Sequence, residues 1–373
     1  MKITTLQENL KNGLNIVERT VGKNPSLAIL NNILIETDKN FLKLSSTDLE
    51  IGINYWVLSK IEKEGKIVVP ARVLKDLIGT LPNKKITLEA VNNNLKIELE
   101  NYETQLKGFS PEEFPIIPSI EGDFIEVNCQ EFIRGLSQVF SVASPSQVRP
   151  EISGVFLSFS KDGIKIVATD SFRLAEKTIS LGKKIGKEYS FIIPQKTSQE
   201  LIYALESKEG MLKIYPSASQ IAFEFLMEEV KHPLFRAVSR LIDGEYPNYQ
   251  EIIPKGFKTQ IILPKEEFSN QIKIASLFGG KTNEVKFKID PSKEIIDIFS
   301  QSPELGENRS HLAGKTKGEK NEVAFNWKFI QEGLLNIKSS EVTLEINGDT
   351  GPGVLKPVGD ASYIYILMPI KGS

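Results

Sequence analysis

Cysteine and histidine are scarce in this sequence. Its 373 residues include one cysteine, Cys129, and two histidines, His232 and His311. A single cysteine excludes an intrachain disulfide and any metal site built from a cysteine cluster. The two histidines are not in a zinc-ligand spacing. We therefore expect no bound metal, and we expect Cys129 to be a small core residue.

Long apolar runs and a large net charge are also absent. No stretch approaches the ~18 apolar residues of a membrane span, and the first residues lack the apolar core of a signal peptide, so we expect a cytoplasmic protein. The chain has 46 Lys+Arg against 48 Asp+Glu, for a net charge of −2. This near-neutrality argues against a protein that coats nucleic acid indiscriminately, but it leaves room for one basic surface.

No residue pattern typical of catalysis is present. Gly-Lys-Thr occurs at residues 280–282 and 314–316, without the preceding glycine of a phosphate-binding loop. The adjacent pair Asp170 and Ser171 leaves a hydrolase as one alternative, although no histidine is nearby and no Gly-x-Ser-x-Gly turn surrounds the serine. The sequence predicts no catalytic residue and no cofactor.

One pattern is repeated three times, with a period of roughly 125 residues. In each copy a strand leads into an amphipathic helix, and in the first copy Leu6, Leu10, Leu14 and Val17 lie at helical spacing. A second strand and helix follow. This second unit covers residues 66–78, 190–202 and 322–334. Alternating strands between the helices predict an α+β fold in which each copy has two helices packed on β-sheets.

Equivalent residues begin the second helix of each copy. Pro70, Pro194 and Asn326 occupy the same place in the three segments. Proline and asparagine both suit the start of a helix, because proline needs no amide hydrogen bond there and asparagine can cap the exposed amides. Three matches of this kind support a true repeat.

Proline-containing tails separate the copies. An aromatic residue and proline, followed by Ile-Ile-Pro, occur at residues 114–118 and 246–254. They predict domains at 1–121, 122–253 and 254–373. The third copy differs by a polar insertion at residues 304–320, which we expect to be a long, mobile surface loop.

The second copy contains a turn with an unusual apolar sequence. Lys161, Asp162 and Gly163 predict a hairpin turn, and the return strand leads to residues 169–174 at one end of a sheet. Arg173, between two large apolar residues, can be the polar part of an apolar peptide pocket. Alternatively, it simply lies along an apolar surface.

Aligning the copies shows which part of this turn is shared. Residues 47–48 and 169–170 are both Thr-Asp, which predicts a structural feature of the fold. The same alignment places residues 49–51 opposite residues 172–174, where the two copies differ. The functional prediction is therefore restricted to residues 172–174 and the C-terminal strand expected beside them.

The predicted helices carry lysines and arginines in every copy. If all six helices lie on one side of a continuous sheet, they form a locally basic surface suited to the DNA backbone. Each helix also carries acids, so a solvated face is the alternative for any one of them. The candidate DNA-facing residues are Lys23, Arg72, Arg149, Lys196, Lys273 and Lys338.

Four stretches resemble the bacterial replicative sliding clamp, the beta subunit of DNA polymerase III. They are residues 167–175 (Val-Ala-Thr-Asp-Ser-Phe-Arg-Leu-Ala), 239–249 (Ser-Arg-Leu-Ile-Asp-Gly-Glu-Tyr-Pro-Asn-Tyr), 323–326 (Val-Ala-Phe-Asn) and 365–371 (Tyr-Ile-Leu-Met-Pro-Ile-Lys). The resemblance extends over the full length. It implies a DNA clamp fold and a head-to-tail homodimer whose six domains close into a ring around duplex DNA. Such a ring is a non-catalytic processivity factor, which slides without base contacts.

The resemblance also implies binding sites. An apolar pocket would bind short extended peptides of the DNA polymerase III catalytic subunit, the clamp loader, other DNA polymerases and repair factors. Carried over by residue, the pocket comprises Ile152, Thr169, Ser171, Phe172, Arg173, Leu174, Pro247, Ile252, Ile366, Met368, Pro369 and Ile370. Leu277 and Phe278 are the predicted apolar contact of the dimer.

The chain departs from the family at several positions. Ser171 and Phe172 stand where the family usually has Gly-His, and Glu251 stands where a basic residue is common. These differences predict a different preferred peptide. Pro150 and Glu151 match poorly the residues that contact DNA elsewhere in the family. The remaining alternative is a repeat scaffold that binds peptides but does not encircle DNA.

Overall fold

The computed structural model describes residues 1–22, 27–143, 146, 148–181 and 187–370. The chain forms two compact units. Unit 1 consists of Met1–Arg134 with Lys196–Leu241, and unit 2 consists of Gly135–Gln195 with Ile242–Ser373. Among the described residues, no helix is long and apolar enough to cross a membrane.

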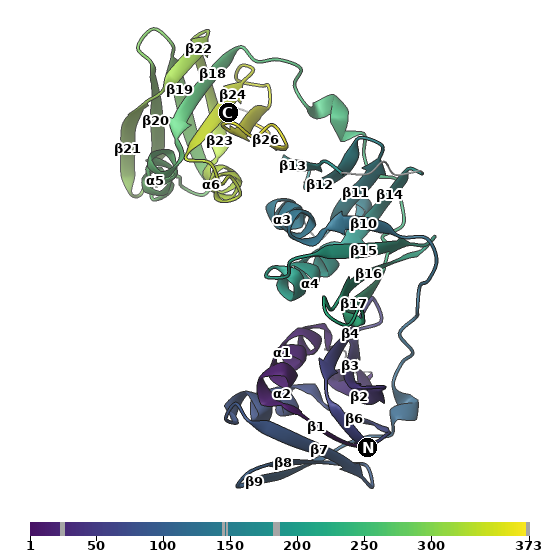
Figure 1. Cartoon of the computed structure of the whole chain (residues 1–373). Helices are drawn as coiled ribbons and strands as arrows, with labels where there is room; N and C mark the ends of the chain where they lie inside the picture. Colours follow the sequence, from purple (N-terminus) through teal and green to yellow (C-terminus); the bar gives the residue numbers. More distant parts are fainter. Residues whose placement is uncertain (23–26, 144–145, 147, 182–186, 371–373) are drawn as a thin grey trace. The chain divides into compact units, whose positions relative to one another are not determined.

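The described residues form six α-helices: α1 (Gln7–Val17), α2 (Ala71–Thr80), α3 (Cys129–Val139), α4 (Gln195–Leu205), α5 (Lys265–Ser276) and α6 (Trp327–Leu335). Short 3-10 helices are η1 (Glu18–Thr20), η2 (Ala28–Asn31), η3 (Pro111–Glu113), η4 (Phe140–Val142), η5 (Pro150–Ile152) and η6 (Tyr249–Ile252). Figure 1 shows α1 beside α2 and α5 beside α6, and each pair is in contact.

The strands of unit 1 are β1 (Lys2–Leu6), β2 (Asn32–Asp38), β3 (Phe41–Thr47), β4 (Ile51–Leu58), β5 (Lys60–Lys63), β6 (Lys66–Pro70), β7 (Lys85–Val91), β8 (Asn94–Leu99), β9 (Tyr102–Lys107), β10 (Ile125–Asn128), β15 (Met211–Pro216), β16 (Gln220–Leu226) and β17 (Pro233–Arg240). In the described part of the unit they form two sheets, with orders β5-β1-β7-β8-β9 and β10-β15-β16-β17-β4-β3-β2-β6.

The strands of unit 2 are β11 (Gly154–Ser160), β12 (Gly163–Thr169), β13 (Arg173–Ile179), β14 (Tyr189–Pro194), β18 (Thr259–Pro264), β19 (Glu284–Asp290), β20 (Ile295–Ser302), β21 (Gly306–Ala313), β22 (Lys315–Gly318), β23 (Asn321–Asn326), β24 (Glu341–Ile346), β25 (Gly353–Pro357) and β26 (Tyr363–Leu367). Their described residues form sheets with orders β14-β11-β12-β13-β26-β25-β24-β18-β22 and β21-β20-β19-β23.

The predicted strand-to-helix units are confirmed in all three copies. A strand runs directly into each α-helix, as β6 runs into α2 at Pro70 and β23 into α6 at Asn326. The Asn326 side chain accepts a hydrogen bond from the Lys328 amide at 3.0 Å, which satisfies one of the unpaired amides at the helix start. The hairpin at Gly163 is also confirmed, with the glycine at φ +132°.

Apolar spacing predicts the buried face of α1. Leu10, Leu14 and Val17 are fully buried against β3 and β4, whereas Leu6 ends β1 and is 46% exposed. Full burial of a side chain of this size contributes about 1.5–3 kcal/mol, so this face fixes the helix on its sheet. Cys129 is buried as predicted, and burial raises the pKa of its thiol to about 12.

The expectation of a mobile loop at residues 304–320 is wrong. Strand β21 pairs with β20 along eight residues, and β22 pairs with β18. In β21 only Leu312 is buried, so the strand carries polar side chains on both faces. A strand of this kind lacks the apolar alternation by which strands are recognised in a sequence.

Two strand pairs connect successive copies of the repeat. In unit 1, β4 of the first copy pairs antiparallel with β17 of the second, with Ile51 opposite Ser239. In unit 2, β13 of the second copy pairs antiparallel with β26 of the third, with Arg173 opposite Leu367. In both cases the strand after the Thr-Asp turn of one copy pairs with the last strand of the next.

Candidate functional site

The Thr-Asp turn of unit 2 is held by its own side chains. The Thr169 hydroxyl donates to the Arg173 carbonyl oxygen at 2.8 Å. Oδ1 of Asp170 accepts from the amides of Phe172 and Arg173, at 3.0 and 2.9 Å. The backbone reverses at Ser171, which has a φ of +76°. These bonds leave the Phe172 side chain on the outside of the turn.

The turn of unit 1 has the same hydrogen bonds. The Thr47 hydroxyl donates to the Ile51 carbonyl oxygen at 3.0 Å, and Oδ1 of Asp48 accepts from the amides of Glu50 and Ile51 at 3.0 and 2.9 Å. Leu49 has a φ of +76°, like the central residue of the other turn. The prediction that Thr-Asp is a structural feature of the fold is confirmed.

The alignment of the residues after the turn is wrong by one position. Leu49 corresponds to Ser171, because both have the left-handed backbone. Phe172 therefore corresponds to Glu50, and Arg173 corresponds to Ile51. The sequence alignment matched the apolar Leu49 to the apolar Phe172, whereas backbone conformation determines the true correspondence.

Replacement of Ser171 by glycine is expected to stabilise unit 2 by up to about 1 kcal/mol. Left-handed backbone strains residues with a Cβ, and glycine removes this strain. The free energy of unfolding, measured by urea denaturation, is expected to rise. As a control, Ser158→Gly within strand β11 is expected to lower it by about 0.5–1 kcal/mol. A loss of stability in Ser171→Gly would contradict this account.

Arg173 is engaged in contacts within unit 2. Its guanidinium pairs with Asp170 at 2.9 Å, pairs with Glu332 of α6, and lies over the ring of Phe329 at 4.6 Å from the centroid. It also donates to the Tyr365 hydroxyl at 3.4 Å. The sequence interpretation treated Arg173 as available to a peptide, whereas in the structure it connects the turn to α6 and β26.

Apolar side chains remain exposed around the turn. Phe172 is 63% exposed and Met368 is 38% exposed, and the Met368 amide donates to the Phe172 carbonyl oxygen at 2.8 Å. We call the exposed side chains of Phe172 and Met368 the Phe172 surface. Ile252, at the end of η6, is 45% exposed. Exposed aromatic and methionine side chains are typical of surfaces that bind other proteins.

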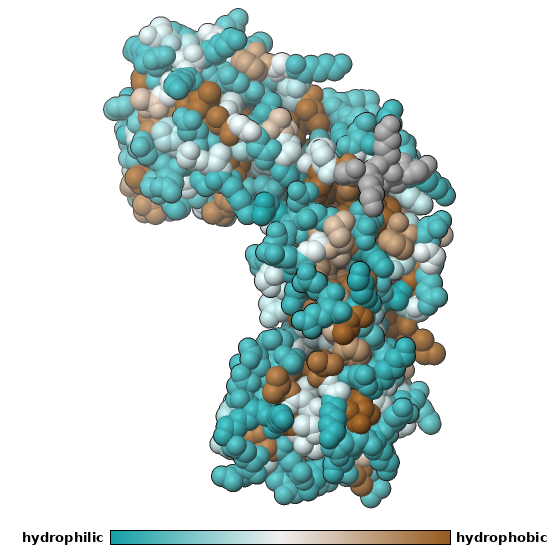
Figure 2. Space-filling view, in the orientation of Figure 1, coloured by the Kyte–Doolittle hydropathy of each residue, from teal (hydrophilic) through white to brown (hydrophobic). Residues whose placement is uncertain are grey.

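The other predicted pocket residues differ in how far they are exposed to solvent. The buried ones are Ile152, Thr169, Leu174 and Ile366. Ser171 is exposed, and the half-buried ones are Pro247, Pro369 and Ile370. The buried residues support the surface rather than form it. Figure 2 shows one face of the molecule, which is mainly polar with scattered apolar patches.

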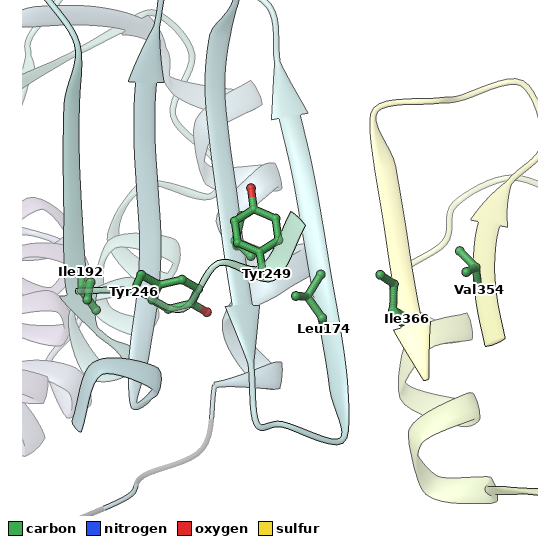
Figure 3. Close-up of a cluster of buried hydrophobic side chains, with 7 residues drawn as sticks. Leu174, Ile192, Tyr246, Tyr249, Val354 and Ile366 are labelled. Carbon is green, nitrogen blue, oxygen red and sulfur yellow. The ribbon is translucent and has the colours of Figure 1, made fainter. Parts of the chain in front are cut away.

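A buried cluster lies beneath the turn. Figure 3 shows Leu174 of β13 and Ile366 of β26 on neighbouring strands, with Tyr249 beside them. Tyr246 stacks on Phe156 with ring centroids 4.7 Å apart. The Tyr249 hydroxyl donates to Glu176 at 2.6 Å, and burial together with this carboxylate raises the pKa of Tyr249.

Sequence reasoning missed these two tyrosines. It used their segment as a domain boundary and as part of a family-like stretch, and it selected only Pro247 from the sequence Tyr-Pro-Asn-Tyr at residues 246–249 as a pocket residue. In the structure, Tyr246 and Tyr249 fix this tail to the cluster under the turn. They thereby hold Pro247 and η6 in place.

The predicted DNA-facing residues have different surroundings. Arg149 pairs with Glu151 at 3.1 Å and donates to the Ser171 hydroxyl at 3.2 Å, and Lys196 pairs with Asp48. Arg72 is exposed and lies 3.8 Å from Asp76. Lys273 and Lys338 are exposed. Lys23 lies outside the described residues.

The predicted dimer contact is partly exposed. Leu277 is 67% exposed just after α5, and Phe278 is half-buried. Within the described residues, no three His, Cys, Asp or Glu side chains are placed to hold a metal ion.

Models of the DNA polymerase III beta subunit match three successive parts of this chain. The N-terminal domain model matches residues 1–118, the central domain model residues 126–248, and the C-terminal domain model residues 250–371. The chain belongs to this family. Its three similar domains and its fold are those of the family. The predicted boundaries at 121/122 and 253/254 stay predictions.

Individual relatives support this assignment. The chain is 27% identical to the beta sliding clamp of Synechococcus elongatus over 379 residues, covering 100% of this chain and 99% of the relative. It is 28% identical to that of Bacillus subtilis over 384 residues, with full coverage of both. Among solved structures, the DNA polymerase sliding clamp of Bacillus subtilis has a TM-score of 0.92 and the DNA polymerase III beta subunit of Thermotoga maritima 0.91, each 26% identical with full coverage of both chains.

Proposed function

We propose that this sliding clamp works as a head-to-tail dimer that encloses duplex DNA, and that its Phe172 surface tethers the DNA polymerase III catalytic subunit. The same surface would bind the clamp loader, other DNA polymerases and repair factors in turn. Family membership supports the clamp function. The observation that carries the ring is the pattern of strand pairing between copies.

The pattern of strand pairing between copies leaves one strand of the first copy and one strand of the third copy without a partner strand from another copy in the described part of the chain. The first copy pairs with the second through β4 and β17, and the second pairs with the third through β13 and β26. In the third copy the equivalent strand is β21, because β4, β13 and β21 are each the third strand after the first α-helix of their copy. By the same rule, β21 would pair with β9, the last strand of the first copy. Both strands end their sheets in the described part of the chain.

A second molecule can provide a partner strand for both β21 and β9. If β21 of each molecule pairs with β9 of the other, two chains of three copies close into a ring of six. Closure leaves no such strand edge open to further association. A head-to-tail contact that did not close would instead produce filaments. The proposal therefore predicts a discrete dimer.

A ring explains DNA binding by a protein of net charge −2. Enclosure holds the protein on DNA by topology, so lysines and arginines need only weak, sequence-independent attraction to phosphates. Exposed Lys273 and Lys338 would contribute to this attraction. No catalytic step is part of the proposed function.

Leu277→Asp is expected to shift the protein from dimer to monomer. Leu277 is 67% exposed after α5 in the third copy, and we propose that it is buried at the joint with the partner molecule. A carboxylate buried in that joint would be costly, and we expect the dimer to weaken by at least about tenfold. Light scattering at micromolar concentration measures the mass, which is 41.7 kDa for one chain.

The matched control is Leu335→Asp. Leu335 is similarly exposed, at 72%, but it lies on α6, whereas Leu277 directly follows α5, the helix in contact with the proposed joint strand β21. This variant is expected to remain a dimer. If the unmodified protein is a monomer at micromolar concentration, the ring proposal is wrong.

A further inference from the structure

A groove of about 180 Å³ lies beside the Thr-Asp turn of unit 1. Its walls come from the turn and β4, from the tail at residues 115–118, and from the ends of β16 and β17. Two aliphatic side chains at this groove face solvent: Ile116 is 93% exposed and Leu49 is 43% exposed. The described chain covers almost none of the Ile116 side chain, so this side chain is available to contact another molecule.

The groove repeats the layout of the Phe172 surface. The Arg240 amide donates to the Glu50 carbonyl oxygen at 2.9 Å, as the Met368 amide donates to the Phe172 carbonyl oxygen at 2.8 Å. Arg240 in unit 1 is therefore structurally equivalent to Met368 in unit 2, and Glu50 is equivalent to Phe172. Both pairs follow the same hydrogen-bonded turn.

The strand register extends this correspondence. Gly52 lies opposite Val238 in one strand pair, as Leu174 lies opposite Ile366 in the other. The glycine leaves space, and the tail fills it: a Cβ at Gly52 would lie 2.8 Å from Cγ2 of Ile117. Since Ile117 is packed inward, its neighbour Ile116 is left on the outside.

The two surfaces differ in charge. Arg240 replaces an uncharged methionine, and its guanidinium forms no ion pair with any residue that the structure describes. Glu50 also lines the groove, so one charge of each sign is present. A guanidinium favours carboxylates, because it can donate two parallel hydrogen bonds to them.

We infer that this groove is a second docking site, for an extended peptide that carries an aliphatic residue next to an acidic one. The aliphatic side chain would cover Leu49 and Ile116, and the carboxylate would pair with Arg240. This inference rests on the proposed peptide function of the Phe172 surface, whose layout the groove repeats. The experiment below separates the two.

The probe is the capped hexapeptide Ser-Ser-photoleucine-Asp-Ser-Ser, irradiated with the full-length protein at millimolar peptide concentration. Crosslinked segments are identified by proteolysis and mass spectrometry. Label is expected within residues 47–52 or 115–118. The matched probe with asparagine in place of aspartate is expected to label this groove about tenfold less, because it lacks the charge that Arg240 pairs with.

Substitutions of the exposed residues Arg240 and Glu50 are expected to have opposite effects on labelling of the groove. Arg240→Ala is expected to reduce labelling of the groove by about tenfold, whereas Glu50→Gln is expected to preserve or raise it, because an acid beside the bound carboxylate is removed. Neither substitution touches the backbone hydrogen bond between the two residues. Both variants are therefore expected to fold.

The outcomes separate the two sites. Label at Phe172 and Met368 alone overturns the second site and leaves the proposed function intact, whereas label at the groove alone supports the second site and counts against the Phe172 surface. Label at neither overturns both. Equal labelling by the aspartate and asparagine probes overturns recognition of a carboxylate, and crosslinks at the groove between two copies of the chain identify a second copy as its occupant.

Discussion

Replacing Arg173 by alanine is expected to lower the free energy of unfolding of unit 2 by about 3–5 kcal/mol. The Arg173 side chain is 10% exposed, and its guanidinium pairs with Asp170, whose side chain is 11% exposed, and with Glu332. Burial alone lowers the pKa of Arg173, but Tyr365, Glu332 and Asp170 together raise it. Alanine would leave a buried carboxylate of the turn without its partner.

Tryptophan fluorescence can follow this unit separately. The chain has two tryptophans, of which Trp327 belongs to unit 2 and Trp56 to unit 1. In a Trp56→Phe background, urea denaturation monitored at Trp327 reports the unfolding of unit 2. Arg149→Ala is the control, because its side chain is 47% exposed and its pair with Glu151 is worth less than about 1 kcal/mol. Equal losses in the two variants would contradict the structural role of Arg173.

Met368→Asp is expected to reduce binding of the DNA polymerase III catalytic subunit by at least about 100-fold. Met368 is 38% exposed and is one of the two side chains of the Phe172 surface, where a bound peptide would bury it. A carboxylate in an apolar contact has to be desolvated without a partner. Surface plasmon resonance with immobilised polymerase measures the change in the dissociation constant.

Two controls accompany this prediction. Val230→Asp, at a side chain that is 56% exposed in unit 1, is expected to leave polymerase binding unchanged. The Met368→Asp protein is also expected to keep the mass of the dimer in light scattering. Binding as tight as that of the unmodified protein would show that the polymerase contacts another surface.

Local signals predicted much of the fold. Pro70, Pro194 and Asn326 mark the starts of equivalent helices, because helix starts depend on the amides of one turn and the residues next to them. The Thr-Asp turn could also be recognised, since its hydrogen bonds join residues within four positions of one another. Features of this kind are encoded within a few residues.

Features that depend on distant residues could not be predicted. Arg173 pairs with Glu332, 159 positions along the chain, and no local pattern indicates that contact. Strand β21 lacks apolar alternation because only Leu312 is buried, so the segment resembled a polar loop. The aligned residues after the turns were misplaced by one, because Leu49 and Ser171 share a backbone conformation rather than a side-chain type.

The topology of DNA binding tests the central claim most directly. The protein is loaded by a clamp loader onto a nicked circular duplex, and the circle is then cut once with a restriction enzyme. A closed ring is expected to remain on the circle through gel filtration and to be lost from the linear form, because it can slide off the ends. Equal retention on circular and linear DNA would contradict enclosure and would indicate ordinary surface binding.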